Sequence, residues 1–111
     1  MRLYTSDSSG SRWADVTAPG VSAAVGGARW FWLDVAEPAQ AEIDEVGRAL
    51  DIPPDVVADI VKTTEYPKLH EYDDALFAVS HSPGVSTHRF STHELDIYLT
   101  ERALVTFHRE Q

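Results

Sequence analysis

The sequence predicts an α/β domain in which a mixed β-sheet carries helices on at least one face. Runs of aromatic and branched apolar residues, which favour strands, occur at residues 29–35, 75–79 and 94–108. Between the first two runs, two segments repeat apolar residues at the spacing of amphipathic helices. The order of one strand, two helices, a strand and a hairpin is typical of helices packed on a sheet.

The composition predicts one folded domain over residues 1–111. A chain of this length can bury roughly two thirds of its unfolded surface, and 43% hydrophobic residues are too many for a disordered chain. The absence of Cys excludes disulfides, thiolate zinc sites and a cysteine nucleophile. No stretch is long and apolar enough for a membrane span or a secretory signal, so we expect a soluble chain that is not exported.

The net charge of −9 is concentrated in the middle of the chain. From Asp34 to Asp74 there are twelve acidic against three basic residues, whereas the two kinds balance elsewhere. Nucleic acid and anionic membrane surfaces would be repelled, so we expect neither as a partner. Divalent cations or a basic partner fit the charge better, although a solvated helical face also explains such a run.

The N-terminal third is predicted to hold three strands and a loop. Residues 1–5 and 12–16 are short strand candidates on either side of a turn-forming segment. Residues 17–28 combine small residues with Pro and Gly, which favours a loop, and their Gly pair has neither the Lys nor the spacing of a phosphate-binding loop. The aromatic run over residues 29–35 predicts a central strand that is buried on both faces.

Two amphipathic helices are predicted next. The first has Pro38 in its first turn, ends near Asp51, and has an apolar side made of Ile43, Val46 and Leu50. The second has Pro54 in its first turn and an apolar face made of Val56, Val57, Ile60 and Val61.

The C-terminal third is predicted to add three strands. Residues 75–79 form a buried strand, and residues 82–84 mark a turn after it. Residues 94–99 alternate, with Leu95, Ile97 and Leu99 on one face and a wetter side formed by Glu94, Asp96 and Tyr98. Residues 103–108 alternate as well, and we expect them to form a hairpin with residues 94–99.

Two groups of polar residues resemble ligand sets by composition. His70, Glu71, Asp73 and Asp74 precede the strand at residues 75–79, but alternation along a strand beginning near Leu69 separates them onto two faces. We therefore interpret them as the polar approach to that strand, which leaves little support for a hydrolase using His70 and Asp73. The other group flanks the predicted turn and lacks the close spacing of a metal motif, so surface histidines are the simpler interpretation: His81, His88 and His93.

Asp55 and Asp59 are a more useful pair, because they lie four residues apart on the side of the second helix opposite its apolar stripe. Hard cations such as Mg2+ prefer carboxylate oxygens and keep most of their water. The Asp59 carboxylate is expected to point to solvent or to another chain. The pattern fits either a cation site or an ordinary solvated face.

Three segments, in this order, carry a resemblance to a known family: "WFWLDVAEPAQAEIDEVGRALDIPPDVVADIV", "YPKLHEYDDALFAVS" and "ELDIYLTERALVTFHRE". Together they resemble the N-terminal cytosolic domain of the CorA family of magnesium and cobalt transporters. The resemblance covers Trp30 to Glu110, and residues 1–29 match nothing clearly. It implies a non-enzymatic α/β domain on the cytoplasmic side of the cell inner membrane, in a homopentameric channel whose funnel senses intracellular Mg2+ and gates the pore.

The resemblance also implies a site. In the family, an aspartate late in the second helix faces the neighbouring subunit and helps to hold a regulatory Mg2+; Asp59 matches it here, and Asp55 is a possible helper through water. Co2+ or Zn2+ could take the place of Mg2+. Bare carboxylates on adjacent subunits repel, so a bound cation favours the closed ring. Two residues depart from the family pattern: Tyr66 replaces a frequent arginine, and Ala58 replaces a frequent acid.

The pore helices, the Gly-Met-Asn signature between them and the long helix that supplies the partner aspartate are absent from these 111 residues. We therefore expect that this chain does not transport an ion by itself and meets a membrane only through such C-terminal helices. Two alternatives remain: a domain of a related zinc transporter, in which the three histidines would gain interest, and a free-standing soluble binding module with the same fold.

Overall fold

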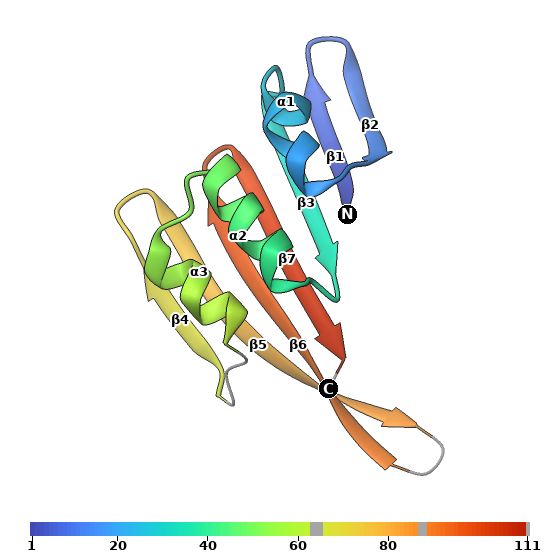
Figure 1. Cartoon of the computed structure of the whole chain (residues 1–111), viewed down its shortest axis with the longest axis vertical. Coiled ribbons are helices and arrows are strands. Elements are labelled where there is room, and N and C mark those ends of the chain that lie inside the picture. The colour runs from blue at the N-terminus through green and yellow to red at the C-terminus, as the bar shows by residue number, and fades with distance from the viewer. Residues whose placement is uncertain (63–65, 87–88, 111) are drawn as a thin grey trace.

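The computed structural model describes residues 1–62, 66–86 and 89–110, and its ribbon is drawn in Figure 1. In chain order the elements are β1 (Arg2–Asp7), β2 (Gly10–Asp15), the 3-10 turn η1 (Ala18–Gly20), α1 (Val21–Val25), β3 (Trp30–Ala36), α2 (Gln40–Ala49), α3 (Pro54–Val61), β4 (Lys68–Glu71), β5 (Ala75–Ser86), β6 (Arg89–Thr100) and β7 (Ala103–Glu110). No helix in the described part is long and apolar enough to cross a bilayer.

The strands form one mixed sheet in the order β2-β1-β3-β7-β6-β5-β4. Neighbouring strands are antiparallel, with the exception of β3 and β7, which run parallel with Leu33 opposite Val105. A parallel pair needs a long crossover, and here α2, α3 and the strands β4 to β6 lie between β3 and β7 in the chain. The predicted α/β class with a mixed sheet is therefore confirmed.

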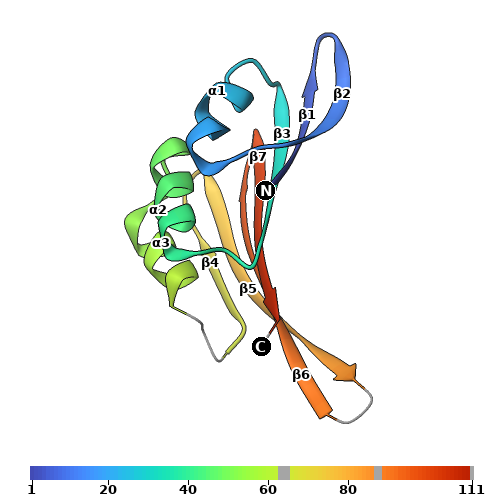
Figure 2. The same ribbon diagram turned by 45° about the vertical axis from the view of Figure 1, so that its right-hand side comes forward.

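The helices all lie on one face of the sheet, as the turned view in Figure 2 shows. The hydrophobic core fills the space between them and the sheet, and Leu33, Val46, Ile60, Phe77 and Val105 are fully buried in it. On β3 the residues facing the helices are buried, whereas those facing the other way are only partly so. The prediction that this strand is buried on both faces is thus wrong for its helix-free side.

The first 29 residues add two strands to the same sheet and one short helix to the layer that covers it. The two predicted N-terminal strands are confirmed as β1 and β2, and β1 joins the sheet beside β3. The prediction of a loop over residues 17–28 is wrong, because η1 and α1 form there and bury Val21 and Val25. The Arg102 guanidinium donates hydrogen bonds to the carbonyl oxygens of Val25 and Ala28, so a side chain far away in the sequence anchors this short helix.

The two larger helices follow the predicted amphipathic pattern with one change at the start of α2. Pro38 precedes this helix, whose N-terminal cap is Ala39, so the expected place of Pro38 in the first turn is wrong. The Glu42 carboxylate accepts a hydrogen bond from the Ala39 amide and ties the cap to the first turn. Pro54 does begin α3, as predicted.

The predicted turn at residues 82–84 is wrong, because β5 continues through them to Ser86 and pairs with β6 along its whole length. β4 pairs with β5 only from Leu76 to Val79, so Pro83 lies where β5 has a single neighbour strand. A proline is tolerated at such an edge position. The resulting β5–β6 arm projects beyond the rest of the sheet in Figures 1 and 2.

The wetter side predicted for β6 is in fact the side that faces the helices. Glu94 and Asp96 are each 1% exposed and Tyr98 is 7% exposed, whereas Leu99 on the opposite face is 39% exposed. Pairing explains the reversal, since Asp96 lies between Val79 and Phe107, both of which belong to the core. Alternation separates the two faces of a strand, but the neighbouring strands decide which face the helices cover.

Candidate functional site

The two aspartates of α3 both bind side chains from the segment that follows the helix. The carboxylate of Asp59 lies 2.5 Å from the ammonium of Lys68 on β4. The carboxylate of Asp55 accepts a hydrogen bond of 2.9 Å from the hydroxyl of Tyr72. The structure therefore brings the predicted pair to the edge of the sheet formed by β4, one turn of helix apart.

Asp59 is neither buried nor freely solvated, because its side chain is 27% exposed and that of Lys68 is 30% exposed. The expectation that its carboxylate points to solvent or to another chain is met only in part, because the carboxylate also pairs with Lys68 of its own chain. Its open part leaves room for a further ligand, and any cation bound there would compete with the Lys68 ammonium. The neighbouring Tyr72 shares the acidic surroundings: burial and the hydrogen bond to Asp55 raise the pKa of its hydroxyl.

Within residues 1–62, 66–86 and 89–110, no group of three or more His, Asp or Glu side chains is arranged to hold a metal ion. Asp55 and Asp59 supply two carboxylates on adjacent turns of α3. A hard cation with most of its water retained needs only one or two protein carboxylates. The geometry thus suits a hydrated cation that takes its remaining ligands from water or from another chain.

The polar residues that precede β5 are split between a strand and a turn. Leu69, His70 and Glu71 belong to the short edge strand β4, whereas residues 72–74 form the turn into β5. The interpretation of one continuous strand beginning near Leu69 is therefore corrected to two antiparallel strands. The ring of His70 lies 6.3 Å from that of Tyr72.

The histidines of the β5–β6 arm do not converge in the part of the chain that is described. His81 pairs across the ladder with Glu94, and His93 is the next residue along β6. Successive residues of a strand face opposite sides, so His81 and His93 point away from one another. His88 lies outside the described residues.

A second polar cluster lies beneath the C-terminal end of α3, where the sequence pattern indicates a solvated strand face. The Arg109 guanidinium donates a hydrogen bond of 2.9 Å to the carbonyl oxygen of Ile60 and lies 3.9 Å from the Glu94 carboxylate. The imidazole of His81 lies 3.8 Å from the same carboxylate. Burial, followed by the charge of Glu94, raises the pKa of Asp96 to about 8.

A third polar group joins β3 and β7 on the helix-free face. The Trp32 indole donates to the Thr106 hydroxyl at 2.9 Å, and that hydroxyl donates to Asp34 at 2.7 Å. The other carboxylate oxygen of Asp34 lies 3.0 Å from His108. The alternation along each strand indicates which of these residues share a face. Only the parallel register of β3 and β7 shows that they are neighbours.

Comparison with known proteins shows which family the sequence and fold of this chain match. Residues 27–111 match the family described as CorA-like Mg2+ transporter protein. The protein YfjQ of Bacillus subtilis (strain 168), whose name describes a metal ion transporter, is 32% identical over 79 residues, which are 71% of this chain and 24% of that protein.

Two solved structures from Methanocaldococcus jannaschii have the same fold at 18% sequence identity. The complete CorA magnesium transporter superposes with a TM-score of 0.68 over 96% of this chain and 32% of its own. The soluble domain of CorA superposes with a TM-score of 0.69 over 98% of this chain and 41% of its own. This chain spans less than half the length of each of these relatives.

The family match begins close to β3 and continues through the helices and the remaining strands, so it includes both aspartates of α3. The superpositions extend the likeness of fold to β1 and β2, since they cover nearly the whole chain. The matched family is one of transporters and not of enzymes. With a family match over most of its length and a relative at 32% identity, this chain belongs to the CorA-like Mg2+ transporter protein family.

Proposed function

We propose that this chain is the metal-sensing cytosolic domain of a divalent cation transporter, on the cytoplasmic side of the cell inner membrane. In the complete transporter it would assemble as a homopentamer, and Asp59 would hold a regulatory cation against the neighbouring subunit. The observation that carries the proposal is the position of Asp59: its carboxylate is partly open at the last turn of α3 and is balanced by one lysine. Mg2+ is the natural occupant, with Co2+ or Zn2+ as alternatives.

The acidic residues around α3 would supply the driving force for cation binding. Twelve of the 18 acidic residues lie between Asp34 and Asp74, which includes both larger helices. When such surfaces face one another across a subunit boundary, their charges repel, and a divalent cation between them removes the repulsion. Asp55, whose carboxylate already accepts one hydrogen bond, would contact the cation through water.

Gating follows if the cation prefers one arrangement of the subunits. A ligand shifts a conformational equilibrium only by the difference between its affinities for the two states. A cation held by two subunits has its full ligand set only when they pack together, so it favours the packed, closed ring. The sensor is useful only where the free Mg2+ concentration is close to the affinity of the site.

The test begins with this chain alone. Amide signals of α3 and β4 are followed by NMR during titration with Mg2+, in the wild type, in Asp59→Asn and in the control Asp73→Asn, which removes an exposed acid from the β4–β5 turn. We expect Asp59→Asn to weaken the response several-fold and the control to retain it. Equal responses in all three proteins would overturn the assignment of Asp59.

The regulatory part is tested in the complete transporter that carries this domain. Inhibition of the cation current by intracellular Mg2+ is measured in the wild type and in Asp59→Ala. We expect the variant to need several-fold more Mg2+ for the same inhibition. Unchanged inhibition together with weakened binding to the isolated domain would show that the site binds a cation without gating the channel.

A further inference from the structure

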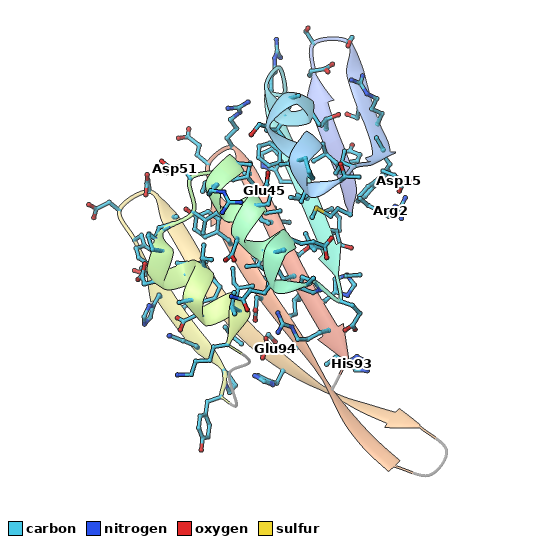
Figure 3. The ribbon with its side chains drawn as sticks, in the orientation of Figure 1. Arg2, Asp15, Glu45, Asp51, His93 and Glu94 are labelled. Atoms are coloured by element: carbon cyan, nitrogen blue, oxygen red, sulfur yellow. The ribbon has the colours of Figure 1, made fainter. Side chains whose placement is uncertain are left out.

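Two acidic residues of β6 are buried beneath α3. Glu94 and Asp96 occupy alternate positions on the helix-covered face of the strand and are each 1% exposed. Figure 3 shows the Glu94 side chain near the C-terminal end of α3, and Arg109 joins the two elements by contacting both Glu94 and the Ile60 carbonyl. The pair is therefore part of the contact between the sheet and the last turn of α3.

Two basic side chains of the described residues approach this pair. The Arg109 guanidinium on β7 lies 3.9 Å from the Glu94 carboxylate and also donates a hydrogen bond to the Ile60 carbonyl at the end of α3. His81 on β5 lies 3.8 Å from Glu94. From the other side, α3 contributes the negative charge of Asp59, which is neutralised by Lys68 on β4. If both acids are ionised, two negative charges lie side by side in the core and repel each other.

Asp96 is the member of the pair that lacks hydrogen-bond donors among the described residues. Neither of its carboxylate oxygens receives a hydrogen bond from a donor in the described part of the chain. The Glu94 carboxyl is close enough to form a hydrogen bond with Asp96 once one of the two acids carries a proton. A single proton would thus give Asp96 the hydrogen bond that it lacks and remove the excess charge.

We propose that Glu94 and Asp96 form a shared proton-binding site that holds the C-terminal turn of α3 against the sheet, and that loss of the proton loosens this turn. The second negative charge would then lie below a helix C-terminus, where the exposed carbonyl groups are themselves partly negative. Asp59 in the same turn adds a smaller contribution to the repulsion, since its charge is paired with Lys68.

The direction of the titration agrees with this geometry. Burial and the charge of Glu94 raise the pKa of Asp96 to about 8, so the proton leaves the pair on the mildly alkaline side of neutral. This inference concerns a proton and does not depend on any bound metal.

The direct test is an NMR titration of the carboxyl carbons and the backbone amides between about pH 6 and about pH 10. In the wild type we expect a carboxyl transition of the pair with a midpoint near 8, and amide signals of residues 58–62 that follow the same midpoint. The Asp96→Asn variant removes the titrating acid and should abolish the amide transition. The exposed control Asp73→Asn should retain it.

Two outcomes would overturn the proposal. One is a pair of carboxyl signals that remain ionised over the whole range. The other is a carboxyl transition that the amides of the last turn of α3 do not follow. If Asp96→Asn does not fold, Glu94→Gln serves in its place, since it keeps the Asp96 acid and removes the neighbouring charge. The midpoint should then fall relative to the wild type, and an unchanged midpoint would contradict a shared site.

Discussion

The ammonium of Lys68 and the carboxylate of Asp59 join the edge strand β4 to the last turn of α3, 2.5 Å apart. This contact places an internal cation at the position where a regulatory cation is proposed to bind. The Lys68 ammonium carries a single charge and is held beside Asp59 by the chain. A divalent ion can displace it only if the ion is attracted to the carboxylate more strongly than the ammonium is. If the proposed site binds a cation, this ion pair would raise the concentration at which the cation binds.

Replacing Lys68 with Met should strengthen binding of Mg2+ to this chain by several-fold. The substitution keeps most of the side-chain length and removes the charge that competes for Asp59. Binding is measured by NMR titration of the α3 amides at fixed ionic strength.

The control for Lys68→Met is Arg48→Met, which changes the net charge equally but removes an exposed cation that pairs with Glu45 on α2. We expect little change in affinity from the control. If Lys68→Met binds Mg2+ less tightly than the wild type, the lysine supports the site instead of competing for it.

Gly47→Ala should destabilise the domain by about 1–2 kcal/mol, although alanine favours helices more than glycine does. A Cβ atom at position 47 would lie 2.7 Å from Cγ2 of Val57, so either the Val57 side chain must turn away or α2 and α3 must move apart. The free energy of unfolding is measured in urea.

The matched control for Gly47→Ala is Gly27→Ala, because a Cβ atom there meets nothing within 4 Å. The double variant Gly47→Ala/Val57→Ala relieves the clash and should recover part of the lost stability. Equal stability of Gly47→Ala and the wild type would mean that the Val57 side chain moves aside without cost.

Local patterns were sufficient to predict most of the fold. Helical spacing located α2 and α3, and the antiparallel hairpin of β6 and β7 follows from two alternating runs with a short connection. The helix α1 was missed because its anchor, Arg102, lies more than 70 residues away in the sequence. The continuation of β5 through Pro83 was missed because only the pairing of β4 shows where β5 becomes an edge.

The candidate site could be predicted only in part, because local spacing does not show contacts between distant segments. The spacing of Asp55 and Asp59 places them on one side of α3, but their partners Tyr72 and Lys68 come from the following turn and strand. The cluster around Glu94 could not be predicted, since alternation is equally compatible with either face being buried. Two carboxylates in a strand indicate solvent unless the register against neighbouring strands is known.

Arg109→Met should reduce the free energy of unfolding by about 2–4 kcal/mol. The guanidinium is mostly buried, and its removal leaves Glu94 without its arginine and the Ile60 carbonyl without its donor. Urea unfolding measures the loss, and the exposed Arg12→Met on β2, which weakens a surface ion pair, should change little. An Arg109→Met protein as stable as the wild type would show that the cluster beneath α3 contributes nothing to folding.

Stability should fall as the pH rises toward 8, and Asp96→Asn should reduce this dependence. Because burial and Glu94 raise the pKa of Asp96 from 3.8 in the unfolded chain to about 8, the folded state binds more protons between these values. Stability then decreases with pH across that window and levels off above it. The slope of the unfolding free energy against pH is measured by urea unfolding at several pH values from about 6 to about 9. Ordinary carboxylates do not titrate in this range, so they do not contribute to the slope. The exposed control Asp73→Asn should keep the wild-type slope, and an equally steep slope in Asp96→Asn would mean that another group releases the proton.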